Sequence, residues 1–282
     1  MIQGDLKPSS KTKDGVMLFS FNNLEVKISS ETKTLFVFIQ PERLNLETLF
    51  ELEGLTQWLQ SHIEVQSVVI SNEHALFPLS PSDETLGRWS VDQLKHFQQK
   101  LSRVVWAFHK VPQTVIADCK MGTDSFGIEL ALCADIVLLD YEGEMHFDYL
   151  EKGIVPMSGG VSLLAEAVGA HRARRWLLST SSVSSEELEA CGWIQAINDR
   201  EQIVDILKKI NQQSSIARIQ LKRQWQEWFS PIHNKIEEVE SPFALAAHQS
   251  EDYQRPFRQE SFANARDVAL KMREKSIDSS SH

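Results

Sequence analysis

Apolar runs near the start of the chain predict β-strands. Residues 16–21, 24–28 and 34–39 are rich in β-branched and aromatic side chains, and turn-forming clusters separate them. We expect these runs to form a meander. A stripe of leucines at helical spacing follows, and residues 65–71 then read as a buried strand, so the meander leads into a β-α-β unit. The stripe consists of Leu46, Leu49, Leu52, Leu55 and Leu59.

Strands and helices then alternate along the chain. Residues 114–118 and 136–139 are apolar runs of strand length, whereas residues 127–133 and 161–168 have helical character. Parallel neighbours in a sheet need crossover connections, which are usually helices. The alternation therefore predicts an α/β core with a parallel sheet and helices packed outside it.

The last part of the chain has a different pattern. Strand signals fade after residue 200, so we divide the chain into a core of residues 1–200 and a helical C-terminal region of residues 201–282. Trp225 and Trp228 form an apolar stripe in this region, which is typical of packing in a core or between subunits. Residues 1–14 are polar and have the composition of a frayed terminus.

The charge balance excludes some partners. The 282 residues hold 29 Lys and Arg against 39 Asp and Glu, which gives a net charge of −10. This charge repels phosphate backbones and anionic lipids, so we expect neither a nucleic-acid nor a membrane partner. Three cysteines without CxxC spacing fit reduced thiols. Without a signal-like segment or an apolar run of about 20 residues, the pattern favours a soluble, cytoplasmic protein.

Several common cofactor motifs do not occur in the sequence. There is no glycine-rich dinucleotide motif, no phosphate-binding P-loop and no HExxH. The nine histidines are scattered, and none has a metal-like spacing to another histidine or to a cysteine. We therefore expect neither a metal site nor a bound cofactor.

Residues 114–197 carry a family pattern. Glu129 begins an ELAL run that Asp135 follows, and a later stretch has a glycine-rich G-x-x-P-x-x-GG form ending at Gly160. These pieces and their spacing resemble the enoyl-CoA hydratase/isomerase (crotonase) superfamily. A weaker similarity upstream, through residues 69–71 and Phe77, extends the resemblance to about two thirds of the chain. The resemblance implies a spiral of ββα units with a C-terminal helical trimerisation region. It also implies a homotrimer or a dimer of trimers.

The same resemblance implies a reaction centre that binds an acyl-CoA thioester. Glu129 matches the first catalytic carboxylate of the family, whereas the second falls on Tyr149, next to Asp148. A phenol with a pKa near 10 cannot serve as a base at neutral pH, but it can donate a proton or a hydrogen bond. We therefore assign Glu129 and Tyr149 as the candidate catalytic residues.

The resemblance further implies two backbone amides that bind the thioester oxygen and stabilise its enolate. They fall on Leu79, which two prolines flank, and on Phe126, where the family has glycine. Phe126 either keeps its amide available or places its ring where the thioester lies. The residues expected to line the pocket are Phe77, Ser125, Gly127, Asp148, Pro156 and Gly159.

Two functions follow from this pattern. The first is a crotonase-type acyl-CoA-processing enzyme, a lyase or isomerase with an atypical site, acting through a thioester enolate as an isomerase, hydratase, hydrolase or decarboxylase. The alternative is a catalytically degraded protein of the same fold that acts as a binding, regulatory or assembly subunit. Loss of turnover in Glu129→Gln supports the first, and the absence of thermal stabilisation by any acyl-CoA supports the second.

Overall fold

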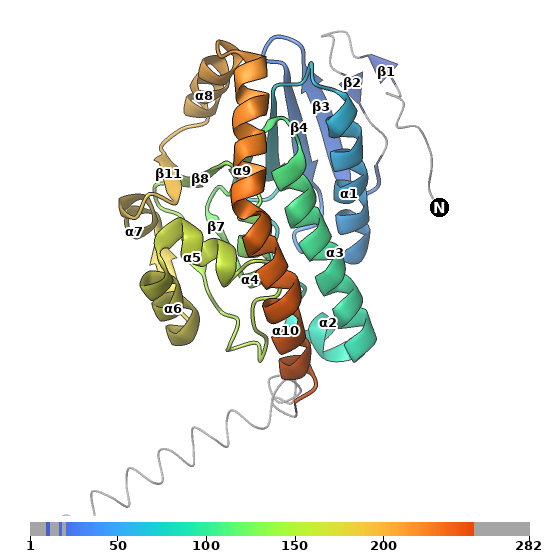
Figure 1. Ribbon diagram of the computed structural model, residues 1–282, viewed down its shortest axis with the longest axis vertical. Helices are drawn as coiled ribbons and strands as arrows, with labels where there is room; N and C mark the ends of the chain where they lie inside the picture. Colours follow the sequence, from blue (N-terminus) through green and yellow to red (C-terminus); the bar gives the residue numbers. More distant parts are fainter. Residues whose placement is uncertain (1–9, 12–16, 19–20, 251–282) are drawn as a thin grey trace, which may run out of the picture.

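The computed structural model describes residues 10–11, 17–18 and 21–250 (Figure 1). The polar N-terminal segment predicted for residues 1–14 lies outside the described residues except for Ser10–Lys11. Likewise, the C-terminal region is described as far as residue 250.

A main sheet of eight strands carries the core. Its strands run in the order β1, β2, β3, β4, β5, β6, β8 and β11. The first four pair antiparallel, and β2, β3 and β4 confirm the predicted meander as far as it is described, since residues 16, 19 and 20 lie outside the described residues. The strands from β4 to β11 pair parallel, which confirms the predicted α/β core. Their bounds are Ser10–Lys11, Met17–Leu18, Leu24–Ser29, Thr34–Ile39, Ser67–Asn72, Thr114–Asp118, Ile136–Asp140 and Ile194–Ile197.

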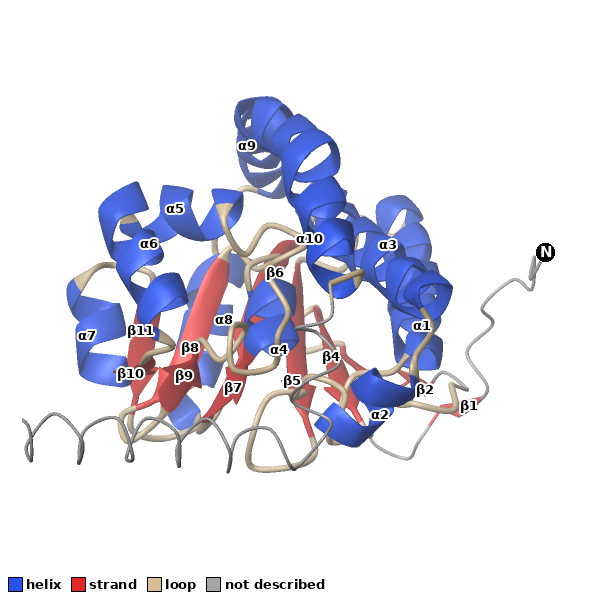
Figure 2. Cartoon of the chain, turned by 90° about the horizontal axis from the view of Figure 1, so that it is seen from below, coloured by secondary structure: helices blue, strands red, loops and turns tan. Residues whose placement is uncertain are grey.

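The central strands are buried on both faces. Val68 and Ile70 of β5 point into the larger hydrophobic core, and Val69 between them points into a smaller one. Helices α1 (Leu46–Ser61) and α3 (Val91–Lys110) cover one face, as Figure 2 shows, and α8 (Glu201–Asn211) contributes to the smaller core. The continuous apolar runs in the sequence reflect this double burial.

A second sheet of three strands was not apparent from the sequence. It consists of β7 (Gly122–Asp124), β9 (Glu144–His146) and β10 (Ser182–Ser184). Each strand has only three residues, which is too short for an alternating pattern to show. Strand β7 leads directly into α4 (Ser125–Ala131), the helix that carries Glu129.

Four further helices connect the strands, and others form the C-terminal region. The former are α2 (Asp83–Arg88), α5 (Ser162–Val168), α6 (Ala170–Ser179) and α7 (Ser185–Ala190). After α8, the chain continues as α9 (Ser215–Lys235), a π-helical turn η1 (Ile236–Glu240) and α10 (Ser241–His248). The prediction of a helical region is thus confirmed as far as it is described.

The C-terminal helices have one buried and one exposed side. Ile236 and Ala244 belong to the larger hydrophobic core. Trp225 and Trp228 are instead 48% and 62% exposed. Of the two explanations that the sequence allows for this tryptophan stripe, packing within the core is therefore excluded.

Candidate active site

Glu129 lies in the interior of the protein on helix α4. All seven residues of this helix are buried, and Glu129 is 0% exposed. Its carboxylate accepts hydrogen bonds from the amides of Met157 and Ser158, with the Met157 nitrogen 3.3 and 3.2 Å from its two oxygens. The backbone after Pro156 thus supplies donors to a carboxylate that has no solvent-exposed surface.

The surroundings of Glu129 favour its protonated form. Burial raises the pKa of Glu129 to about 8, and the negative charge of Glu240 adds to this effect. The amides of Met157 and Ser158 act in the opposite direction but do not outweigh burial. Glu129 is therefore a carboxylic acid that titrates close to neutral pH.

Glu240 is a further acidic residue of the site, and the sequence reasoning missed it. It lies at the end of the π-helical turn η1 and is 6% exposed. One carboxylate oxygen accepts from the Gly159 amide at 3.0 Å, and the other accepts from the Ser162 amide at 2.7 Å. No signal in the sequence indicates this residue, because it comes from the region where the family pattern fades.

Tyr149 lies beside Glu129 and is 1% exposed. Its hydroxyl donates a hydrogen bond to the carbonyl of Ser125 at 2.6 Å. Burial raises the pKa of Tyr149 well above its ordinary value of 10, and the charge of Glu129 adds to this effect. The phenol therefore keeps its proton at neutral pH, and that proton is directed at the protein backbone.

Gly160 allows the turn to pack against both candidate catalytic residues. A Cβ atom at this position would lie 3.0 Å from the Tyr149 hydroxyl and 3.2 Å from Cγ of Glu129. It would also lie 2.7 Å from Cβ of Pro156. A side chain at position 160 would therefore push the turn away from the site.

Both predicted oxyanion amides have hydrogen-bond acceptors within the protein. The Leu79 amide donates to the carbonyl of Glu42 at 2.9 Å. The Phe126 amide donates to the hydroxyl of Ser80 at 3.0 Å. In this structure, a thioester oxygen would have to replace both acceptors. The role of the two amides as oxyanion donors remains a prediction.

Aromatic rings fill the space around the start of α4. Phe126 is 0% exposed, and its ring centroid lies 5.6 Å from that of Phe97 and 6.5 Å from that of Tyr149. Phe77 is also fully buried, and its amide donates to the carbonyl of Gly122. Phe126 was expected either to keep its amide available or to place its ring where the thioester lies. In the structure its ring is buried, and its amide is bonded to the Ser80 hydroxyl.

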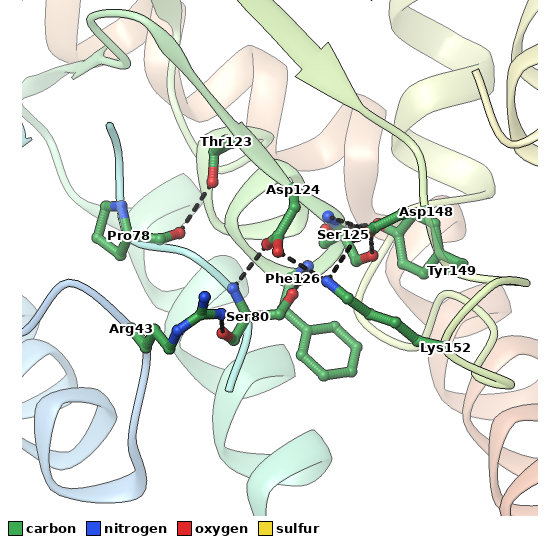
Figure 3. A network of polar contacts seen from close by, with 10 residues as sticks. All are labelled: Arg43, Pro78, Ser80, Thr123, Asp124, Ser125, Phe126, Asp148, Tyr149 and Lys152. Carbon is green, nitrogen blue, oxygen red and sulfur yellow. Dashed lines mark hydrogen bonds and ion pairs between the residues drawn. The ribbon is translucent and has the colours of Figure 1, made fainter. Parts of the chain in front are cut away.

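An ion network lies next to these rings (Figure 3). The ammonium of Lys152 is 2.7 Å from a carboxylate oxygen of Asp124 and 2.7 Å from one of Asp148. Asp124 also accepts from the Ser80 amide at 2.6 Å, and Asp148 accepts from the amide and hydroxyl of Ser125. The network thus links the loop around residue 80 to the start of α4, and the sequence reasoning did not include Lys152.

Among the residues that the structure describes, Lys152 is the one cation that pairs with the two aspartates of this network, and its own protonation state follows from them. Burial alone lowers the pKa of Lys152, but the negative charges of Asp124 and Asp148 outweigh burial and raise it above 10.5. Lys152 is therefore a firmly charged ammonium at neutral pH.

The remaining predicted pocket residues lie in the same place. Gly127 is on α4, where a Cβ atom would come within 2.2 Å of the Pro78 carbonyl, so glycine permits this close approach. Pro156 and Gly159 flank the amides that bind Glu129. The structure therefore places Gly127, Pro156 and Gly159 near Glu129 in the buried interior, and their role in lining a pocket remains a prediction.

Two further properties concern the described part of the chain. No helix among the described residues is long and apolar enough to cross a membrane. Within residues 10–11, 17–18 and 21–250, no three His, Cys, Asp or Glu side chains are grouped so that they can hold a metal ion.

The chain is similar to a known protein family and to one of its named members. The enoyl-CoA hydratase/isomerase family matches residues 41–269. The chain is 29% identical over 101 residues to YhaR of Bacillus subtilis (strain 168), whose name refers to the same family. This match covers 36% of the chain and 40% of YhaR, so it spans less than half the length of that relative.

Solved structures share the fold at low sequence identity. An enoyl-CoA hydratase from Bacillus halodurans has a TM-score of 0.77 at 17% identity, and the match covers 84% of this chain and 100% of the other. One from Mycobacterium avium subsp. paratuberculosis K-10 has a TM-score of 0.75 at 18% identity, and the match covers 84% and 98%. These matches confirm the predicted crotonase-like fold, and the extent of the family match shows that the chain belongs to the enoyl-CoA hydratase/isomerase family.

Proposed function

We propose that the protein is an acyl-CoA-processing enzyme in which Glu129 transfers a proton at the carbon next to the thioester. The observation that carries this proposal is the fully buried carboxyl of Glu129 with a pKa of about 8. Acid–base catalysis is most efficient when the pKa of the group lies near the working pH. At pH 7, roughly a tenth of such a group is ionised, so both protonation states are accessible.

The other residues favour reactions that need a single carboxylate. Tyr149 stands where the family has its second carboxylate, and its proton is already bonded to the Ser125 carbonyl. Hydration of a double bond by two carboxylates is therefore disfavoured. Isomerisation through an enolate fits better, because Glu129 alone can take a proton from one carbon and return it to another. Decarboxylation also fits, because loss of carbon dioxide forms the enolate and Glu129 needs only to protonate it. Hydrolysis needs no enolate: Glu129 can take a proton from the water that attacks the carbonyl and give it to the departing thiolate.

Thioester binding requires a local rearrangement. The Leu79 and Phe126 amides must leave the Glu42 carbonyl and the Ser80 hydroxyl. Each of these hydrogen bonds contributes about 1 kcal/mol net, and the thioester oxygen would replace them as the acceptor. We infer that the loop containing Leu79 and Ser80 moves when an acyl-CoA binds.

The test is turnover of a panel of acyl-CoA thioesters by matched variants. The panel contains a short enoyl-CoA, a β-keto thioester and malonyl-CoA. We expect Glu129→Gln to lower kcat by at least about 100-fold, because general acid–base groups contribute about this much. The control is Glu142→Gln, which removes the same charge at an exposed position and should keep wild-type turnover. Equal turnover by the two variants would contradict the proposal.

A second candidate function is a binding, regulatory or assembly subunit without catalysis. It is favoured by the internal acceptors of both oxyanion amides and by the buried ring of Phe126. This candidate predicts that no member of the acyl-CoA panel raises the melting temperature. A rise that grows with ligand concentration would exclude it in favour of the enzyme.

For the assembly, we propose a homotrimer or a dimer of trimers that buries one side of α9. Leu221, Trp225 and Trp228 are spaced four and three residues apart, and they are 53%, 48% and 62% exposed. An exposed apolar stripe of this kind is typical of a surface that contacts another chain. Light scattering should give a trimeric or hexameric mass for the wild type and a lower mass for Leu221→Glu. A monomeric wild type would contradict the assembly.

A further inference from the structure

One turn of the backbone is bound by two buried carboxylates from distant parts of the chain. Glu129 on α4 and Glu240 on η1 divide the amides of residues 157–162 between them. Glu129 accepts from Met157 and Ser158. The donors to Glu240, at 3.0, 3.5 and 2.7 Å, are Gly159, Val161 and Ser162.

A π-helical turn presents Glu240 to this backbone. Such turns are rare and occur frequently at functional sites. The turn begins at Ile236, which is anchored in the hydrophobic core, and ends at Glu240. The anchored turn thus holds a carboxylate against the amides at the start of α5, where partial positive charge favours it. Val239, the residue before Glu240, points outward and is 49% exposed.

We propose that Glu240 is a positioning residue for Glu129 and acts through the turn of residues 157–162 that both carboxylates bind. This proposal rests on the proposed role of Glu129 in proton transfer. Ser158 donates to Glu129, and the next residue, Gly159, donates to Glu240. A movement of the backbone at Gly159 therefore also displaces the amides that donate to Glu129. Glu240 therefore fixes the donors of Glu129 without approaching a substrate.

The charge of Glu240 also acts on Glu129 directly. The groups that face Glu129 are the carboxylate of Glu240, the hydroxyl of Tyr149 and the two amides. Among the described residues, neither Glu129 nor Glu240 forms an ion pair with a Lys, Arg or His side chain. In the part of the chain that the structure describes, no cation is therefore paired with either carboxylate.

The first experiment follows the titration of Glu129 by NMR of carboxyl-labelled glutamate in the full chain. The Glu129 signal is assigned by its loss in Glu129→Gln. In Glu240→Gln, one acceptor oxygen remains on the side chain but the charge is gone, so we expect the midpoint to fall by about one pH unit. The matched control is Glu238→Gln, on the same turn but exposed, which should leave the midpoint unchanged. An unchanged midpoint in Glu240→Gln would overturn the proposal.

The second experiment measures positioning through the backbone. In Glu240→Ala, we expect hydrogen exchange at the Met157 and Ser158 amides to become at least about tenfold faster, although neither amide contacts Glu240. A purely local structural role would speed exchange only at Gly159, Val161 and Ser162, and that result would overturn the proposal. Glu238→Ala serves as the control and should exchange like the wild type.

A third measurement needs no variant at position 240, in case these variants fail to fold. In the wild-type protein, the amide signals of Gly159 and Ser162 should shift with the same midpoint as the Glu129 carboxyl, because one turn links them. Signals that stay constant through that midpoint would overturn the proposal.

The outcome can be separated from that of the proposed function. The titration and the exchange need no substrate, so they report on Glu240 even if no thioester is turned over. If turnover is found, Glu240→Gln should shift the pH profile of kcat in the same direction as the Glu129 midpoint. Equal turnover by Glu129→Gln and the wild type would remove the proposed function while leaving the coupling measurable.

Discussion

Two pairs of carboxylates lie in the same site, and they are compensated in different ways. Asp124 and Asp148 share the ammonium of Lys152, which lies 2.7 Å from each (Figure 3). Glu129 and Glu240 share only a backbone turn. The first pair raises the pKa of its lysine, and in the second pair the pKa of Glu129 rises to about 8.

The difference shows how the surroundings of a carboxylate decide its use. The ammonium of Lys152 forms an ion pair with each of the two aspartates, so this group is suited to holding the segments of Asp124 and Asp148 together. Amide dipoles carry only partial charge, and they do not offset the burial of Glu129 beside another carboxylate. Glu129 can therefore change its protonation state near neutral pH, which proton transfer requires.

The largest expected effect that tests this comparison is the pH dependence of stability. The folded protein keeps the Glu129 proton up to about pH 8, whereas the unfolded chain releases it near pH 4.5. The stabilisation of the folded state that this proton provides is complete below pH 4.5. It decreases as the pH rises and is lost once the pH passes about 8. The free energy of unfolding should fall by about 1.4 kcal/mol per pH unit within this window, and by about 5 kcal/mol at most.

Urea denaturation between pH 5 and pH 8 checks this prediction. Glu129→Gln has no titrating group at this position, so its stability should lack the decline assigned to Glu129. Parallel pH curves for the wild type and Glu129→Gln would show that Glu129 has an ordinary pKa.

The second largest effect on stability is expected for Asp124 and Asp148, which share Lys152. Lys152→Met removes the shared cation and leaves two carboxylates without it, which should lower the free energy of unfolding by about 3 kcal/mol at pH 7. The same substitution at the exposed Lys95 is the control and should change stability by less than about 0.5 kcal/mol. If the two variants unfold at the same urea concentration, Lys152 does not hold the network together.

A substitution at the turn tests how closely the second pair is packed. Gly160→Ala places a methyl group 2.7 Å from Pro156 Cβ and 3.0 Å from the Tyr149 hydroxyl, which should cost about 2 kcal/mol. Gly54→Ala is the matched control, because it lies within α1 with no atom within 4 Å of the new Cβ. The control should gain about 0.5–1 kcal/mol. Thermal unfolding of both variants measures the difference, and a stabilised Gly160→Ala would contradict the packing.

The smallest effect concerns the hydroxyl on the Phe126 amide. Ser80→Ala removes this acceptor and should cost about 1 kcal/mol of stability. The amide is then free for a thioester oxygen, so calorimetry should show acyl-CoA binding that is tighter than for the wild type. Ser230→Ala, at an exposed position on α9, should change neither quantity. Weaker binding by Ser80→Ala would indicate that the hydroxyl helps to hold the ligand.

Much of the fold followed from periodicity. The leucine stripe predicted α1, and residues 114–118 predicted β6 with its observed bounds. These elements have long or strongly apolar patterns that burial imposes directly. The three strands of the small sheet were missed because three residues carry no period.

The candidate site could be predicted only in part. Glu129, Tyr149 and their neighbours were found because their spacing along the chain matches a family pattern. Lys152 and Glu240 were missed, although both bind groups of the site. An exposed lysine and a buried one look alike in a sequence, and Glu240 lies 111 residues after Glu129.

By itself, the sequence determined which residues are carboxyl, phenol or amide and which segments are apolar enough to form the sheet and helices. These properties depend on residue type and local spacing. Only the tertiary structure decided that the predicted oxyanion amides have internal acceptors, that Lys152 joins two aspartates, and that Glu240 faces the turn beside Glu129. Burial and charge proximity set the protonation state of a carboxyl group, and both arise only when distant segments pack together.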